Sequence, residues 1–172
     1  MTAYVALLRA VNVSGTGKLP MNDLAAMCAA AGHSSVRTYI ASGNVVFASG
    51  LTEAAVKSDL EARLADYAGK PVGVMVRSAA EMAAVRDANP FLQAPGNRVV
   101  AIFLDVPPPA DTAEKAVNKA EHEAIALGAR EIYVRYDAGM GTSKLRIPAA
   151  KSATARNMNT VAKLAEMAGT LK

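Results

Sequence analysis

Two stretches of the chain carry residue types that bind anions, with an arginine placed five positions ahead of a Ser-Gly pair. They are Arg9 with Ser14-Gly15 and Arg37 with Ser42-Gly43. An arginine offers a planar fork of N–H donors that matches carboxylates and phosphates, and glycine lets the backbone approach a ligand closely. Asn12 and Asn44 add amide groups beside these pairs. If the two stretches meet in space, they form a candidate binding site for a small, nucleotide-like anion.

Further candidate ligands for an anion lie near the end of the sequence. They are Lys144, Arg156 and Asn157. Lys144 follows a glycine-rich turn at residues 137–141, whose backbone can approach a ligand closely. Arg156 is expected in or just before the first turn of the last helix, where the helix dipole disfavours a cation by about 0.3–1 kcal/mol. A bound anion or an ion pair with a nearby carboxylate would offset that cost.

Each candidate also has a structural interpretation that needs no ligand. Arg9 could form a salt bridge, for example with Asp23, since a buried arginine must be paired or must face a cleft. Arg37 could stack on Tyr39 or be solvated. The Asn12 amide could cap a turn, and the lysine of the hairpin could simply be exposed. The residue types alone leave these alternatives open.

No motif for catalysis or metal binding accompanies these residues. Residues 14–18 (SGTGK) lack the spacing and the following hydroxyl of a phosphate-binding P-loop, so a flexible turn is expected there. The two histidines have no partners at metal-ligand spacing, and we expect neither a metal nor a cofactor. An enzyme acting on a small metabolite remains an alternative, with Asp137, Tyr39 or Tyr133 as the general acid or base.

Composition indicates a folded protein with a modest positive charge. The 172 residues are 52% hydrophobic and 20% charged, and 19 basic residues against 15 acidic ones give a net charge of +4. This excess is compatible with an anionic partner but too scattered to indicate nucleic acid, which stays a further alternative. A single cysteine, Cys28, fits a reducing cytoplasm, and no apolar run is long enough to predict a membrane span. The oligomeric state is not predicted.

The elements that would position these residues follow a regular order in the first half of the chain. Alternating apolar residues predict strands, and apolar residues at helical spacing predict helices that end near glycines. The expected strands cover residues 3–11, 36–41, 45–48 and 71–77, and the expected helices cover residues 20–31 and 52–67. This βαββαβ order is typical of the ferredoxin-like fold.

The expected topology brings distant residues together. Right-handed crossovers make strands one and two parallel, with strand three antiparallel between them. The ends of strands one and two therefore share one edge of the sheet. This places residues 12–15 near residues 42–44, as the anion-binding hypothesis requires.

The second half is interpreted as a diverged copy of the same unit. Residues 1–77 are expected to form the first ferredoxin-like unit, residues 78–97 a helix and linker loop, and residues 98–172 the second unit. Within the second unit we expect a strand at 98–106, a helix at 111–127, a hairpin of strands 131–136 and 143–147, and a closing helix. The predicted fold class is α+β, with two ferredoxin-like α/β plait units whose antiparallel sheets are covered by helices.

Several longer segments are jointly distinctive. They are YVALLRAVNVSGTGKLPMNDL, VRTYIASGNVVF, NPF, IYVRYDAGMGTSKL and TARNMNTVAKLAEMA. Through these segments the sequence resembles the bacterial domain-of-unknown-function 1697 family, over nearly the whole chain. The resemblance implies two ferredoxin-like units, and it implies no established activity, cofactor or catalytic residue. The sequence departs from the family pattern at Ala10, Ser14 and Met158, and matches it least over residues 105–128.

Overall fold

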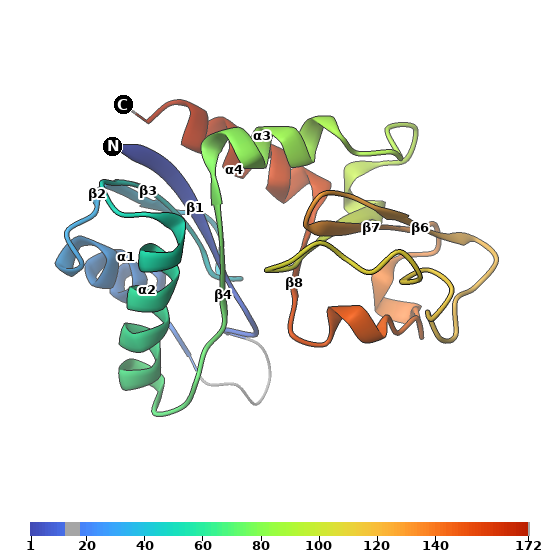
Figure 1. Ribbon diagram of the computed structural model, residues 1–172, viewed down its shortest axis with the longest axis horizontal. Coiled ribbons are helices and arrows are strands. Elements are labelled where there is room, and N and C mark those ends of the chain that lie inside the picture. The colour runs from blue at the N-terminus through green and yellow to red at the C-terminus, as the bar shows by residue number, and fades with distance from the viewer. Residues whose placement is uncertain (13–17, 172) are drawn as a thin grey trace. The chain divides into compact units, whose positions relative to one another are not determined.

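The computed structural model describes residues 1–12 and 18–171, which form two compact units (Figure 1). Unit 1 comprises Met1–Ala83 and Lys163–Lys172, and unit 2 comprises Ala84–Ala162. The sequence assigned residues 163–172 to the second unit, whereas their backbone contacts group them with the first. Because residues 13–17 lie outside the described residues, the structure gives no position for Ser14 or Gly15.

Unit 1 has the predicted βαββαβ order. Its elements are β1 (Thr2–Leu8), α1 (Met21–Ala30), β2 (Ser34–Thr38), β3 (Asn44–Ser49), α2 (Glu53–Ala68) and β4 (Val74–Ser78). The strands lie in the order β2-β3-β1-β4, and each is antiparallel to its neighbours. Strands β1 and β2 are therefore parallel, with β3 between them, and the ferredoxin-like prediction is confirmed.

The bounds of α2 follow from capping residues. The side chain of Thr52 accepts a hydrogen bond from the backbone N–H of Ala55 (3.2 Å), which satisfies a free donor of the first turn. At the other end Gly69 adopts a left-handed conformation (φ 70°) and its N–H bonds the Ala65 carbonyl (2.9 Å). Glycine takes this conformation without a steric penalty, so the helix stops there and the chain turns towards β4.

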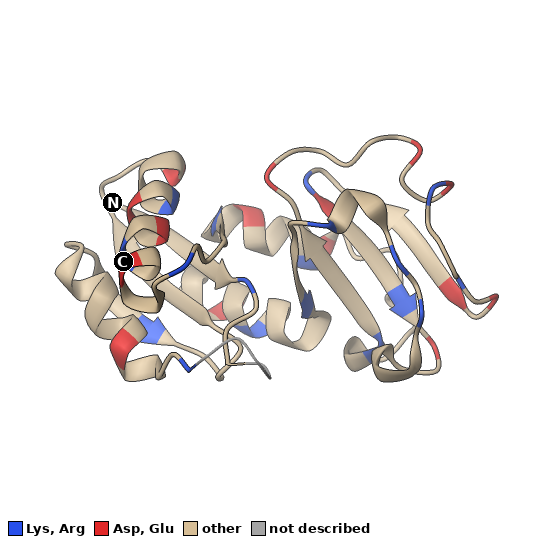
Figure 2. Cartoon of the chain, turned by 90° about the horizontal axis from the view of Figure 1, so that it is seen from below, with Lys and Arg blue, Asp and Glu red and all other residues tan. Residues whose placement is uncertain are grey.

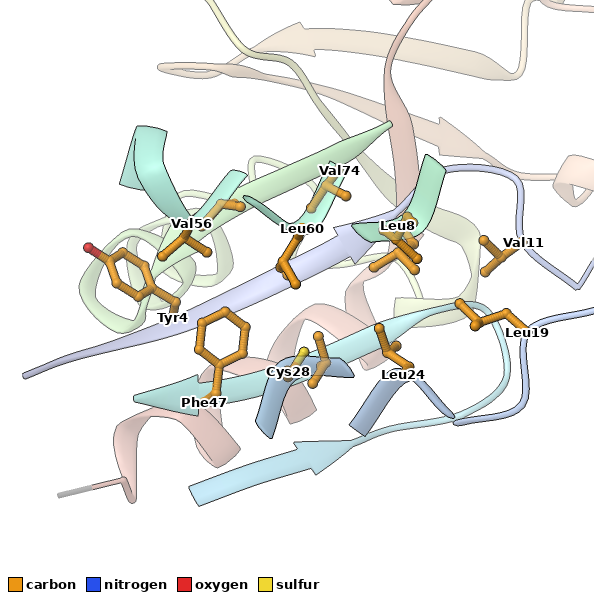
Figure 3. Packing of buried hydrophobic residues seen from close by; sticks show 14 residues of the cluster. Tyr4, Leu8, Val11, Leu19, Leu24, Cys28, Phe47, Val56, Leu60 and Val74 are labelled. Carbon is orange, nitrogen blue, oxygen red and sulfur yellow. The ribbon is translucent and has the colours of Figure 1, made fainter. Parts of the chain in front are cut away.

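Helices α1 and α2 pack on one face of the sheet of unit 1 (Figure 3). Leu24 and Cys28 of α1, and Leu60 of α2, are fully buried in this core. Val11 and Leu19 lie at one end of the cluster in the same view. Burial raises the pKa of the Cys28 thiol to about 12, so this side chain acts as a small apolar residue. The core thus positions Val11 and Leu19.

Helix α3 (Ala79–Asp87) follows β4 directly and connects the two units. Ser78 caps the helix as the predicted pattern requires, because its hydroxyl accepts a hydrogen bond from the Glu81 N–H (3.2 Å), and it also donates to the Glu81 carboxylate (3.2 Å). The helix ends ahead of Asn89-Pro90, as expected.

Unit 2 repeats the strand order of unit 1. Its strands are β5 (Val99–Phe103), β6 (Glu123–Leu127), β7 (Glu131–Tyr136) and β8 (Thr154–Asn157), and α4 (Met158–Gly169) follows. The order β6-β7-β5-β8 is antiparallel throughout and matches β2-β3-β1-β4 position by position. The prediction of a second, diverged ferredoxin-like unit is therefore confirmed at the level of the sheet.

The predicted helix at residues 111–127 is wrong. Turns occupy residues 110–115, and residues 123–127 form strand β6. The apolar spacing suits a helix, but pairing of β6 along β7 outweighs local propensity. The Glu123 carboxylate also bonds the Ala120 N–H (2.9 Å) and the Ser143 hydroxyl, which fixes a turn before the strand.

The predicted strand at residues 143–147 is also wrong. A 3₁₀ turn (Met140–Thr142) precedes this segment, and a second one (Pro148–Ala150) follows it. Strand β7 is already paired on both sides, with β5 and β6, so no edge remains for residues 143–147. The segment makes a single bridge, between Arg146 and Val117. Unlike the expectation, irregular segments and not helices cover this face of the sheet of unit 2 (Figure 1).

Candidate anion-binding site

Three cationic side chains line one cavity of unit 1. They are Arg9, Lys18 and Lys70. The cavity has a volume of about 360 Å³. It lies where the end of β1 meets the residues just before β4, which are joined by a hydrogen bond from the Arg9 N–H to the Gly73 carbonyl (2.9 Å). The other lining residues are Ala10, Val11, Leu19, Leu64, Tyr67, Ala68, Pro71, Val72 and Gly73. The described lining thus combines positive charges with apolar side chains and contains no carboxylate.

Local structure brings the three cations to this cavity. Arg9 follows β1 immediately, and the left-handed backbone of Ala10 (φ 54°) and Asn12 (φ 56°) turns the chain away from the sheet. Lys18 precedes Leu19, which is buried in the core. Lys70 follows the glycine that ends α2. All three side chains therefore come from positions just beyond regular elements.

Tyr67 contributes a hydroxyl at the edge of the same cavity. It donates a hydrogen bond to the Asp23 carboxylate (2.7 Å), which joins the last turn of α2 to the first turn of α1. This hydrogen bond is the main cause of the raised pKa of Tyr67. Asp23 itself is not part of the lining, and its carboxylate accepts this hydrogen bond from Tyr67.

Asn12 links three backbone groups beside the cavity. Its Oδ1 accepts a hydrogen bond from the Leu19 N–H (2.6 Å), and its Nδ2 donates to the carbonyls of Leu19 (2.8 Å) and Ala41 (2.7 Å). The amide therefore bridges the segments before and after residues 13–17 to the turn that precedes β3. This geometry is the one expected if the Asn12 amide pairs with backbone groups and needs no ligand.

The second predicted turn is likewise built from its own side chains. The buried Asn44 donates from Nδ2 to the Tyr39 carbonyl and the Ser42 hydroxyl (both 2.9 Å). Gly43 adopts φ 89° and its carbonyl accepts a hydrogen bond from the Leu8 N–H (2.8 Å). The turn therefore packs against the end of β1, as the topology predicted, but its asparagine and serine are occupied with one another.

The remaining candidates lie elsewhere. Arg37 is exposed on the edge strand β2, and Lys144 is exposed in unit 2. Arg156 lies in β8, just before the first turn of α4, and its buried guanidinium donates to the Thr154 hydroxyl (2.8 Å) and the Ala155 carbonyl (2.9 Å). Burial lowers the pKa of Arg156 to about 10. Asn157 caps α4, because its Oδ1 accepts from the Thr160 N–H (2.9 Å).

Sequence reasoning missed that Arg156 has a counterpart in unit 1. Arg77 on β4 pairs in register with Val5 of β1, as Arg156 pairs with Ala101 of β5. Both arginines are buried, and both donate from Nη1 to the carbonyl of the preceding residue. A capping residue and a helix follow each of them. The final strand β8 was not predicted, and aligning the two Arg-cap-helix segments would have shown it.

The residues proposed for acid–base chemistry have other partners. The Tyr133 hydroxyl donates to the Val85 carbonyl (2.7 Å) inside unit 2, and burial raises its pKa to about 12. The Asp137 carboxylate binds Arg135 (2.9 Å). Tyr39 lies in the turn between β2 and β3, where its backbone N–H bonds the Asn44 carbonyl (3.0 Å), and it does not line the cavity. Among the described residues no three His, Cys, Asp or Glu side chains form a group that could hold a metal ion.

Comparison with known proteins assigns the chain to a family. A model of the family described as a protein of unknown function, DUF1697, matches residues 1–133. The chain belongs to this family. The match includes the whole run from β1 to β4 and all three cavity cations, and it ends within β7.

A solved structure has the same fold over both units. It is a conserved bacterial protein, SP0830 from Streptococcus pneumoniae, with a TM-score of 0.77 and 23% sequence identity over 97% of this chain and 98% of that chain. At this identity the likeness supports the fold. None of the curated proteins compared with the chain matches it.

Lys70 was not among the candidates predicted from the sequence, although the predicted topology could have identified it. In a ferredoxin-like sheet the last strand runs antiparallel to the first, so its beginning lies beside the end of β1. That relation places residues 70–73 next to Arg9 without any motif. Lys18 was considered only as part of a phosphate loop, whose spacing it does not fit.

Charged residues occur in strands, helices and loops of both units (Figure 2). Among the described residues, none of the helices has the length and apolar character needed to cross a membrane.

Proposed function

We propose that the protein binds a small anionic ligand of the nucleotide or phosphorylated-metabolite class in the cavity of unit 1. The observation that carries this proposal is the lining by Arg9, Lys18 and Lys70 with no carboxylate among the described lining residues. Positive charges from three separate segments converge on one concavity, which attracts a compact anion more strongly than charges scattered over a surface.

The apolar part of the lining suits a ligand that is more than a bare phosphate. Val11 and Leu19 are buried, and Val72 is partly buried beside them, so they form an apolar floor below the cations. Apolar surroundings strengthen the attraction between opposite charges by lowering the local dielectric. A planar or apolar body would lie on this floor while its phosphate or carboxylate contacts the cations.

Calorimetric titration of the full chain with inorganic pyrophosphate and with ADP tests the proposal. We expect binding that weakens as ionic strength rises. Replacing Lys70 or Lys18 by Gln should weaken it about three- to tenfold each, because each change removes one charge-assisted contact. Arg37→Gln is the matched control, since it removes one exposed arginine that does not line the cavity and should leave the affinity unchanged.

A cavity-filling variant separates the concavity from net charge. Ala68→Trp keeps all cations and places a large side chain at the lining, so it should abolish binding of ADP. Equal losses of affinity in Arg37→Gln and Lys70→Gln, or unchanged affinity in Ala68→Trp, would refute the proposal.

We also place the protein in the cytoplasm, where nucleotides and sugar phosphates are found and where the single thiol, Cys28, would stay reduced.

A further inference from the structure

Unit 2 contains a second cavity, of about 560 Å³, on the irregularly covered face of its sheet. Ile102 of β5 and Tyr136 of β7 contribute from the sheet, and Val117 from the segment before β6. The rest of the lining comes from the segment before β8: Leu145, Arg146, Ile147, Pro148, Ala150 and Lys151. The volume falls within the range of about 300–1,000 Å³ that is usual for small-molecule sites.

This cavity exists because irregular segments, and not helices, cover this face of the sheet in unit 2. The corresponding face in unit 1 is covered by α1 and α2, whose side chains interdigitate with the sheet. In unit 2 the cover is two irregular segments joined through the Val117–Arg146 bridge, with backbone hydrogen bonds of 2.8 and 2.9 Å. Irregular backbone cannot present an apolar stripe to the sheet as a helix does, so the space between Ile102 and Ile147 stays open.

Tyr136 gives the cavity a polar group without a partner. Its side chain is 8% exposed, yet its hydroxyl makes no hydrogen bond to any residue in the described part of the chain. A hydroxyl that borders the cavity can donate a hydrogen bond to a ligand that enters it. Burial, together with the nearby Glu123, raises the pKa of Tyr136, so the hydroxyl remains a donor at neutral pH.

Two cations stand at the opening of this apolar cavity. Arg146 and Lys151 are exposed, and both belong to the lining. The negative charge nearest to Tyr136, on Glu123, is already bonded by the Ser143 hydroxyl and the Ala120 N–H. Burial raises the pKa of Glu123, but these hydrogen bonds outweigh it and keep the group ionised. The site therefore offers an apolar interior, one donor and positive charge at its mouth.

We propose that this cavity of unit 2 binds an amphipathic monoanion, a carboxylate carried on an apolar chain or ring. The apolar part lies against Ile102, Leu145 and Ile147, and the carboxylate contacts Tyr136, Arg146 or Lys151 at the mouth. The ligand class differs from that of the unit 1 cavity, which has three cations and whose Tyr67 hydroxyl already donates to the Asp23 carboxylate. The two sites can therefore be tested independently.

Calorimetric titration of the full chain with sodium decanoate, below its micelle concentration, tests this inference. Acetate supplies the charge without the chain, and decanol supplies the chain without the charge. We expect decanoate to bind, acetate not to bind, and decanol to bind about tenfold more weakly than decanoate, because it lacks the charge-assisted contacts. Equal affinity for decanol and decanoate, or no binding of decanoate, would overturn the inference.

Variants locate the bound decanoate. Ala150→Phe fills the cavity and should abolish binding, whereas Tyr136→Phe, which preserves the ring, should weaken it about threefold to tenfold. Arg146→Gln combined with Lys151→Gln should weaken it about tenfold. Lys144→Gln is the matched control, an exposed lysine of the same segment outside the lining.

Further outcomes would contradict the assignment to this cavity. Unchanged affinity in Ala150→Phe, or loss of decanoate binding in Ala68→Trp, would place the ligand elsewhere. If sedimentation shows a dimer that Ala150→Phe dissociates, the cavity is covered by a second copy of the chain and the inference is wrong.

Discussion

The two units share one strand order but differ in what covers their sheets. In unit 1 two helices bury a cluster of 14 described residues, including Leu24, Leu60 and Phe47 (Figure 3). In unit 2 the corresponding cluster has six buried residues, packed against partly buried ones such as Ile125 and Ile147. The comparison teaches that this strand order does not require helices over that face of the sheet, and that the crossover segments decide where space for a ligand remains.

The difference in cover predicts a difference in stability between core positions. Leu60→Ala in α2 should lower the free energy of unfolding by about 4 kcal/mol, because this side chain is fully buried and helix packing limits collapse of the resulting cavity. Ile147→Ala in unit 2 should cost about 1 kcal/mol, because Ile147 already borders open space. Urea denaturation measures both. Equal losses would contradict the proposed difference in packing.

Two glycines with the same backbone angle sharpen this contrast. Gly43 and Gly139 both have φ 89°. An added Cβ at Gly43 would lie 2.6 Å from Val11 Cγ2 and 2.9 Å from Leu8 Cβ, whereas at Gly139 it would lie 3.0 Å from Nη1, at the far end of the long Arg98 side chain. Gly43→Ala should therefore cost about 3 kcal/mol, from strain and overpacking, and Gly139→Ala about 1 kcal/mol, from strain alone. Thermal unfolding of both variants measures the two losses of stability. A larger loss in Gly139→Ala than in Gly43→Ala would contradict the prediction.

The helix caps should show where the units are alike. Ser78 caps α3 after Arg77, and Asn157 caps α4 after Arg156. Alanine at each position should lower the free energy of unfolding by about 1 kcal/mol, since each change frees one backbone donor. A difference of more than about 1 kcal/mol between the two variants would show that the repeated segments are not equivalent. Ser78→Thr and Asn157→Asp, which preserve a capping oxygen, are the controls.

The smallest predicted effect concerns pH and unit 1. His33 stacks on Phe47 with ring centroids 4.3 Å apart, and its Nε2 has no hydrogen-bond partner among the described residues. Burial, the largest cause, lowers the pKa of His33 below its usual 6.5. The unfolded chain therefore binds the proton more readily, and stability present above pH 6.5 should decline as pH falls towards the folded pKa. Urea titrations between pH 7.5 and 5.5 should show that His33→Phe reduces this decline in the free energy of unfolding. The same dependence on pH in both proteins would contradict the prediction.

Strand alternation and helix stripes were sufficient to predict unit 1. Residues 3–8 alternate between two apolar faces, and Gly69 marks the end of α2, so local patterns agreed with the final fold. In unit 2 they disagreed. Residues 111–127 have a capping pattern and helical apolar spacing, yet residues 123–127 pair with β7, a long-range contact that no local pattern reveals. Burial of β8 against β5 was likewise set by tertiary pairing.

The candidate sites were less predictable than the fold. Arg9 was identified from its residue type and its place at a strand end. Lys70 could have been identified as well, because antiparallel pairing of β1 and β4 places the residues before β4 beside the end of β1. The amides of Asn12 and Asn44 look identical in sequence to ligand-binding amides, but the structure uses them to hold turns. The cavity around Tyr136 depends on irregular segments, and irregular segments have no periodic sequence pattern from which their course could be predicted.

The central claim is that the cationic cavity of unit 1 binds a compact anion. Titration of the ¹⁵N-labelled full chain with inorganic pyrophosphate, followed by amide chemical shifts, tests it most directly. We expect saturable shifts at Arg9, Leu19, Lys70 and Gly73, all lost in a variant with Gln at the three cation positions. Shifts centred instead on Arg37 or Lys144, or no saturable shift at millimolar pyrophosphate, would contradict the claim.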